Sequence, residues 1–264
     1  MPITALLDAD IIAFTESAIA KRDDPFGDGE YMNADAVISR ACIEVEKWRT
    51  AAGADDTMLV FSPEDRRNFR KHLAPGEYKA HRAVEKPPCY WPVVAGLKSR
   101  FPWFSIAGVE GDDAMGVLHT SQEFGDTVAV STDKDLYTVP GPLFNPVKQQ
   151  FPVEVGVNQA TWHWWFQVLC GDTSDGYKGC PGIGPVKAER LLPEPDESLD
   201  HRKFILDCWE VAAAQFAVKG LSEDHAVLQA RLARILHRTD YHHEREEICL
   251  WHPDSPQWLD LHEF

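Results

Sequence analysis

The sequence predicts an α/β fold in which a doubly wound parallel sheet is followed by a mostly helical region. Short, continuous apolar runs alternate with segments of helical spacing over the first 157 residues. Acidic residues recur where those runs end or where a helix begins. Beyond residue 158 the strand-like runs almost disappear, so the second part of the chain is expected to be helical.

Four of the apolar runs are expected to be strands of the sheet: residues 3–7, 57–61, 103–107 and 127–130. Their lack of polar alternation is typical of strands that are buried on both faces. Helical spacing predicts a helix over residues 11–20 and another that begins after Asn33, which is a suitable N-cap. A further helix should follow the acidic run at 110–113.

We expect an α/β core over residues 1–157 and a helical region over residues 158–264. Residues 63–90 do not fit the alternation, because they are basic and contain the pairs Pro75–Gly76 and Pro87–Pro88, so we interpret them as an insertion. Arg70 is one of the basic residues that could meet a phosphate backbone there. In the helical region, helices are predicted at 159–169, 186–192, 202–218 and 224–237, with a terminal strand at 246–251.

Composition restricts the class of protein. A net charge of −16 argues against a general nucleic-acid coat protein, although an enzyme whose acids bind metal is compatible with it. The six cysteines form no close pair, which favours a reduced cytoplasmic protein over a disulfide framework or a zinc ribbon. The sequence shows no signal peptide and no apolar segment of membrane length, so no membrane association is expected.

Carboxylates form four clusters at element ends. Any single Asp in such a place is usually a helix cap or a turn residue, but that interpretation does not explain four clusters together. Gathering so many like charges is costly unless divalent cations bind among them. The pattern therefore predicts a site for Mg²⁺ or Mn²⁺, as in phosphoryl chemistry. The candidate ligands are Asp8, Glu110, Asp112, Asp113, Asp133, Asp135, Asp172 and Asp175.

A Gly-rich segment at 179–192 follows the last acidic cluster. It has no Walker motif, and alone it could be an ordinary turn between helices. Gly182 and Gly184 would let backbone N–H groups approach a phosphate, and Lys187 adds a positive charge. Its position directly after GDTSD favours a helical hairpin that binds nucleic acid.

The motifs EYKAHR, EGDD, STDKDL and GDTSDGYKGCPGIGPVKA resemble, in this order, the 5′ nuclease superfamily. The similarity covers residues 3–195 and is strongest to the phage-type 5′→3′ exonucleases and flap endonucleases and to the 5′ nuclease domain of bacterial DNA polymerases. It implies a PIN-like α/β nuclease core, an arch insertion near 63–90 and a helix–two-turn–helix near 172–192.

The resemblance also implies roles for individual residues. Asp8, Glu110, Asp112 and Asp113 would form a first metal group, and Asp133, Asp135, Asp172 and Asp175 a second, for two ions in total. Lys79 and Arg82 would contact the scissile phosphate, with Tyr78 beside them on the DNA. The glycine hairpin would hold duplex DNA and a K⁺ ion. Relatives have an Asp soon after the second strand; in this chain Asp65 is the expected metal ligand and Glu64 the competitor.

The sequence therefore predicts a two-metal 5′→3′ exonuclease and flap endonuclease that acts on DNA with a 5′ end, a flap or a nick. One alternative is a nuclease that acts mainly on RNA or RNA–DNA hybrids, which would share the carboxylates. Another is a non-catalytic, structure-specific DNA-binding protein, although such a protein would not need the acidic residues. Two departures from the family pattern are Tyr177 with Lys178 in the hairpin and the run PPCYWP after the arch start.

Overall fold

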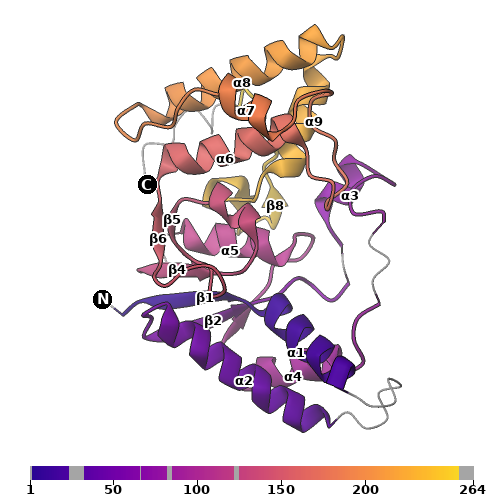
Figure 1. Cartoon of the computed structure of the whole chain (residues 1–264), viewed down its shortest axis with the longest axis vertical. Helices are drawn as coiled ribbons and strands as arrows, with labels where there is room; N and C mark the ends of the chain where they lie inside the picture. Colours follow the sequence, from indigo (N-terminus) through magenta and orange to yellow (C-terminus); the bar gives the residue numbers. More distant parts are fainter. Residues whose placement is uncertain (1, 24–32, 66, 82–84, 122–124, 256–264) are drawn as a thin grey trace.

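A six-stranded sheet forms the centre of the molecule (Figure 1). The structure is a computed structural model that describes residues 2–23, 33–65, 67–81, 85–121 and 125–255. Strand β1 (Thr4–Asp8) pairs in parallel with β2 (Asp56–Val60) and with β4 (Thr127–Val130). The order is β3-β2-β1-β4-β5-β6, where β3 (Trp103–Phe104) and β5 (Gly141–Phe144) are parallel and β6 (Val153–Val155) is antiparallel.

Helices cover both faces of the sheet. Helices α1 (Ala9–Asp23), α2 (Ala34–Ala51) and α4 (Tyr90–Lys98) lie on one face, and α5 (Gly111–His119) lies on the other (Figure 1). Neighbouring positions of a strand point to opposite faces, so each strand feeds two cores. Thus Leu7 packs in the core with α1, α2 and α4, whereas Leu6 packs in the core with α5.

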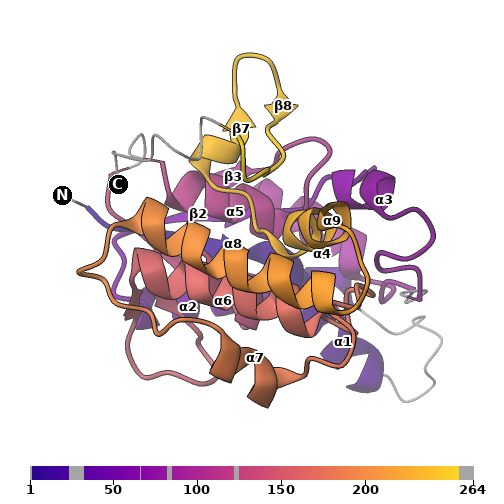
Figure 2. The ribbon, with the colours of Figure 1, turned by 90° about the horizontal axis from the view of Figure 1, so that it is seen from above.

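The helical region stacks on the α5 side of the sheet. It comprises α6 (Val157–Cys170), α7 (Pro185–Leu191), α8 (His201–Val218) and α9 (Glu223–Ala233), which Figure 2 shows from above. Trp164 and Trp165 of α6 are fully buried there and pack against Trp251. These tryptophans are therefore part of the core of the helical region.

Residues 69–80, between β2 and α4, lie against the helical region. They contain the short helix α3 (Phe69–Leu73) and a turn over 75–80, and Ala74 and Tyr78 are buried in the core of the helical region. Near the end of the described chain, β7 (Tyr241–His242) and β8 (Glu247–Ile248) form a two-stranded hairpin. Within the described ranges, no helix is both long and apolar enough to cross a membrane.

Most predicted elements occur in the structure, and the Asn33 side chain caps α2 by accepting from the N–H groups of Asp35 and Ala36. Three predictions were wrong at their ends: the strand expected over 103–107 ends at Phe104, the terminal strand expected over 246–251 covers only Glu247–Ile248, and the helix expected over 224–237 stops at Ala233. After Ala233 the backbone is extended, because its N–H and carbonyl groups bond to side chains and not within a helix. The Arg234 carbonyl accepts from Arg70, and the Leu236 N–H donates to Asp113.

Candidate active site

The carboxyl ends of the parallel strands bring acidic side chains from distant parts of the sequence together. Asp8 ends β1, and Asp133 follows β4, its neighbour in the sheet. Ser131 joins them, because its hydroxyl donates to Asp8 Oδ2 at 2.9 Å and accepts from the Asp133 N–H at 3.0 Å. This is the edge at which open α/β sheets bind their ligands.

We call Asp8, Asp10, Glu110 and Asp112 the first acidic group. Asp10 was not among the predicted ligands, although its position two residues after Asp8 is a signal in the sequence. It accepts from the Ser62 N–H at 2.8 Å and from the Tyr90 hydroxyl at 2.7 Å. Because Ser62 follows β2, these bonds fix the ends of two strands to each other.

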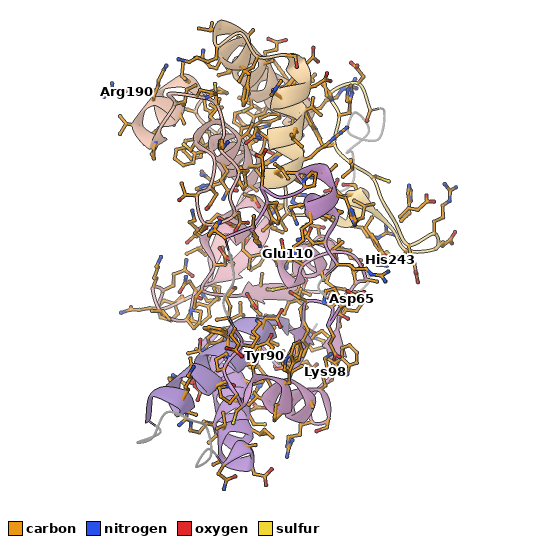
Figure 3. The ribbon with its side chains drawn as sticks, turned by 90° about the vertical axis from the view of Figure 1, so that its right-hand side faces the viewer. Asp65, Tyr90, Lys98, Glu110, Arg190 and His243 are labelled. Carbon is orange, nitrogen blue, oxygen red and sulfur yellow. The ribbon has the colours of Figure 1, made fainter. Side chains whose placement is uncertain are left out.

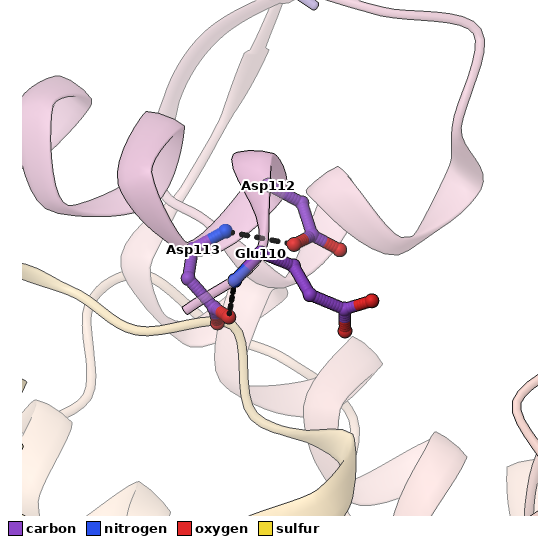
Figure 4. A group of neighbouring side chains, drawn as sticks. All are labelled: Glu110, Asp112 and Asp113. Atoms are coloured by element: carbon purple, nitrogen blue, oxygen red, sulfur yellow. Dashed lines mark hydrogen bonds between the residues drawn. The ribbon is translucent and has the colours of Figure 1, made fainter. Parts of the chain in front are cut away.

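The acidic run at the start of α5 contains two kinds of carboxylate. Atoms of Glu110, Asp112 and Asp113 that could bind a metal lie within 4.8 Å of one another. Figure 4 shows the carboxylates of Glu110 and Asp112 on one side and that of Asp113 on the other. Asp113 accepts two bonds of 2.7 Å from Arg70 and one of 3.1 Å from each of the Glu110 and Leu236 N–H groups.

These four bonds fill the acceptor sites of the Asp113 carboxylate. In this structure Asp113, which is fully buried, therefore braces the site and does not offer a free oxygen to a metal. Asp113 lies within 4.8 Å of the other two carboxylates, but as a metal ligand it would have to give up one of these four bonds. In the acidic run 110–113, Glu110 and Asp112 are therefore the residues whose carboxylates face away from this brace (Figure 4).

Arg70 is the other half of this brace. Its side chain is 3% exposed, and its N–H groups point to Asp113, to Glu110 at 3.5 Å, and to the carbonyls of Leu232 and Arg234. A guanidinium has five N–H donors, and all five are directed at these partners. The predicted DNA contact of Arg70 does not fit this structure, because the charge is buried and engaged within the protein.

Tyr78 and Lys79 connect the first acidic group to the loop after α6. The Tyr78 hydroxyl lies 2.7 Å from Glu110 and 3.0 Å from Asp175, and the Lys79 ammonium lies 2.5 Å from Glu110 and 3.5 Å from Asp175. Gly176 makes this approach possible, because a Cβ there would lie 2.5 Å from the Glu77 carbonyl oxygen. Tyr78 is buried, so its side chain is not exposed on a surface that DNA could contact.

We call Asp133, Asp135 and Asp172 the second acidic group; Asp175 lies between the two groups. Asp172 Oδ1 accepts from the N–H and the hydroxyl of Ser174, and Oδ2 accepts from Lys134 at 2.9 Å. Gln167 of α6 donates to Asp135 at 2.8 Å. Neither Lys134 nor Gln167 was predicted; Lys134 is within STDKD, but its partner could not be read from the sequence.

Burial and crowding change the protonation of both groups. Burial, and then the neighbouring Asp10, raise the pKa of Asp8 to about 7, and burial with Asp133 does the same for Asp135. Burial and the adjacent acids also raise the pKa of Asp112. Burial opposes ionisation of Glu110 and Asp172 too, but Lys79 in one case and Ser174 with Lys134 in the other lower their pKa to about 2.

The remaining predicted residues were expected in the insertion or in the hairpin. Asp65 pairs with Arg67 at 3.3 Å and does not line the cleft beside the first acidic group, whereas its competitor Glu64 pairs with Lys98 at 3.0 Å and lines that cleft with Asp10 and Glu110. Arg82 lies outside the described residues. Gly182, Gly184 and Lys187 are exposed around the start of α7, and Figure 3 shows Arg190 of that helix at the outer end of the helical region, far from Glu110.

A cleft of about 490 Å³ opens beside the first acidic group. Asp10 and Glu110 line it together with cations and aromatic rings, namely Arg67, Lys71, Lys79, Lys86, Phe14, Tyr90 and Trp91. A larger hollow of about 710 Å³ lies at the opposite ends of the strands, where Ile3, Asp126 and Pro140 line it. We assign the chemistry to the smaller cleft, because Asp10 and Glu110 of the first acidic group line it, whereas no residue of either acidic group lines the larger hollow.

Comparisons with known proteins agree with this geometry. The chain is 30% identical over 226 residues to the exodeoxyribonuclease of Enterobacteria phage T3, which covers 75% of this chain and 74% of that protein. It is also 30% identical over 221 residues to the exonuclease of Escherichia phage T7, which covers 74% of each protein. No family model matches the chain.

Solved structures show the same fold. The T5 D15 protein co-crystallised with metal ions superposes with a TM-score of 0.56 at 17% identity, covering 88% of this chain and 93% of that one. A complex of the T5 D15 flap endonuclease with DNA and metal ions gives a TM-score of 0.53 at 15% identity. The parallel-sheet architecture predicted from the sequence is thereby confirmed.

Proposed function

The chain belongs to the 5′ nuclease family that includes the exonucleases of phages T3 and T7, and on this basis we propose that it hydrolyses DNA phosphodiesters at or near 5′ ends, as a 5′→3′ exonuclease and flap endonuclease. The observation that carries the proposal is the convergence of two acidic groups at one sheet edge beside a cleft lined by cations. A non-catalytic DNA-binding protein would have no use for buried, crowded carboxylates.

Two Mg²⁺ or Mn²⁺ ions fit these groups. The donors are carboxylate oxygens, which hard divalent cations prefer. Burial and crowding raise the pKa of Asp8, Asp112 and Asp135, which means that the ionised form of each is destabilised. A cation bound beside them would relieve this destabilisation. Bound there, the ions would activate the attacking water and neutralise charge on the phosphate and the leaving oxygen. Asp8, Asp10, Glu110 and Asp112 would hold one ion, and Asp133, Asp135, Asp172 and Asp175 the other.

The protein's own cations would act on the substrate. Lys79 lines the cleft and its side chain is 14% exposed, so it can turn from Glu110 toward a phosphate that lies over the acidic groups. Positive charge placed there would stabilise the transition state as charge develops. We assign Arg82 the same role from its place in EYKAHR. Tyr78 would keep Glu110 and Asp175 in position through its hydroxyl.

The hairpin before α7 would hold the duplex part of the substrate. Gly184 is exposed and has open space around the position of a Cβ, so a phosphate could approach its backbone, with Lys187 beside it. We propose that this segment is the family's helix–two-turn–helix over 172–192, including its K⁺ site. Residues 1–157 would then form the nuclease core with an arch near 63–90, and residues 158–264 the DNA-binding region.

The experiment that tests the function compares three 5′-labelled substrates: a DNA flap, a nicked duplex and an RNA–DNA hybrid. We expect cleavage of both DNA substrates with Mg²⁺ and none after its removal by chelation. Faster cleavage of the hybrid than of either DNA would favour the RNA-directed alternative. Mg²⁺-dependent binding without any cleavage would contradict the enzymatic assignment.

A further inference from the structure

Lys134 is a cation inside the second acidic group that the proposed reaction does not use. It lies between Asp133 and Asp135 in the short 3-10 helix η2 (Lys134–Thr138). Its ammonium is 2.9 Å from Asp172 Oδ2 and 3.9 Å from Asp135 Oδ1. Asp135 is in η2 and Asp172 follows α6, so this one lysine neutralises charge from two separate segments of the chain.

Asp172 has one oxygen that is held firmly and one that faces Lys134. Oδ1 accepts from the N–H of Ser174 at 2.7 Å, from its hydroxyl at 2.5 Å and from the N–H of Asp175 at 3.3 Å. These bonds come from the loop itself and fix the orientation of the carboxylate. A cation that binds Oδ2 must therefore take the place of the Lys134 ammonium.

Lys134 can leave this position at little cost. Its side chain is 67% exposed, whereas that of Lys79 at the first acidic group is only 14% exposed. The flexible stem of an exposed lysine lets the ammonium return to water, whereas the Asp172 side chain is only 4% exposed and would then need the incoming cation as its partner. The backbone of Lys134 need not move, because Asp133 caps η2 through its own side chain.

We propose that Lys134 is an exchangeable internal counter-ion, which neutralises the second acidic group in the metal-free protein and is displaced when a divalent ion binds. Lys134 thereby sets the affinity of this group for metal. The inference rests on the proposed metal-dependent function and adds to it a residue that tunes metal binding. Two opposite effects of removing the lysine follow: weaker folding without metal and tighter metal binding.

The experiment measures Mn²⁺ binding to the DNA-free protein by equilibrium titration at low ionic strength. Loss of a competing positive charge a few ångströms from the ion should make Lys134→Ala bind the ion of the second acidic group about three- to tenfold more tightly. In parallel, thermal unfolding should show a slightly lower melting temperature without metal and a larger rise on adding Mn²⁺ than in the wild type.

Lys203→Ala is the matched control. Lys203 is 66% exposed and also pairs with an aspartate, Asp207 at 2.5 Å, but on helix α8. It should leave Mn²⁺ affinity unchanged. A second test of location uses the Asp172→Asn background, in which the ion of the second acidic group is expected to be lost, so Lys134→Ala should leave the affinity of the remaining ion unchanged.

Equal or weaker Mn²⁺ binding by Lys134→Ala would overturn the inference while leaving the proposed function intact. The same holds if the gain persists unchanged in the Asp172→Asn background. If the wild type itself binds no Mn²⁺ at either group, the metal-dependent function fails as well, and that outcome is distinct because it appears before any variant is compared.

Discussion

Buried side chains position the first acidic group, whereas a tight loop and an exposed lysine position the second. At the first group, Arg70 and Asp113 form a buried pair that is tied to the segment after α9. At the second, Asp172 is held by Ser174 of its own loop and by Lys134. The first group is thus built into the packing of the whole molecule, and the second is held by contacts within its loop and by the side chains of Lys134 and Gln167.

This difference separates two consequences of mutation that are often confused. Changing a carboxylate that faces the cleft should remove activity and leave the fold, because its charge is crowded and poorly solvated. Changing the buried brace should damage the fold itself, because it leaves a charge without a partner in a dry interior. The same acidic run at 110–113 contains both kinds of residue, as Figure 4 shows.

The largest expected effect is loss of cleavage on neutralising one ligand of either group. Asp112→Asn and Asp172→Asn should each slow single-turnover cleavage of a 5′-labelled nicked duplex by about 10³-fold or more, since each ion supplies several kcal/mol of stabilisation to the transition state. DNA binding, measured in Ca²⁺, should remain. Near-normal rates in either variant would remove that residue from the metal site.

The next effect concerns stability and distinguishes the brace from the ligands. Arg70→Met should lower the free energy of unfolding by about 3–5 kcal/mol in urea titrations, because Asp113 is left buried and unpaired. Arg67→Met is the matched control, since Arg67 also pairs with an aspartate but its side chain is 79% exposed; it should change stability little. A weakened DNA affinity at unchanged stability in Arg70→Met would restore the predicted DNA contact.

The pH dependence of the metal-free protein offers a subtler test. The pKa of Asp8 and that of Asp135 are raised to about 7, so the folded state binds more protons than the unfolded chain between about pH 4 and pH 7. Stability should therefore fall as the pH rises through this window, by roughly 3 °C or more in melting temperature. Mg²⁺, or the variants Asp8→Asn and Asp135→Asn, should flatten the slope; an unchanged slope would show that neither acid is crowded.

The smallest effect is expected far from both acidic groups, at the hairpin before α7. A Cβ on Gly184 would meet no atom within 4 Å, so Gly184→Val should fold normally, as circular dichroism can confirm. It should weaken binding to a long duplex flap by about tenfold or less at fixed salt, because a side chain then separates the backbone from a phosphate. An equal loss on a single strand of the same sequence would mean that the hairpin does not act on the duplex.

Elements with a clear local signal were predictable from the sequence. The strand at 127–130 coincides with β4, because its side chains are buried on both faces and its run is wholly apolar. The antiparallel pair β5 and β6 was missed, since Gly141, Pro142 and an exposed Val153 give no regular pattern. Helix α4 was missed because the prolines of PPCYWP predict an interruption of helical structure. The helix nevertheless begins at Tyr90, two residues after Pro88, and includes Pro92 in its first turn.

The site shows the same limit. Acidic residues at strand ends could be recognised in the sequence as candidate site residues, because a parallel sheet places such ends at one edge. What each carboxylate does depends on partners distant in sequence: Asp113 meets Arg70 and Leu236, and Asp10 meets Ser62 and Tyr90. Neither spacing nor residue type distinguishes Asp112 from Asp113, so the difference between ligand and brace emerged only from the fold.

The most direct test of the central claim is the number of Mn²⁺ ions bound by the protein, counted by equilibrium dialysis at saturating metal. If each acidic group holds one ion, the wild type should bind two, and Asp112→Asn and Asp172→Asn should each bind one. A single ion in the wild type, or loss of both ions in either variant, would contradict two separately held ions at the cleft.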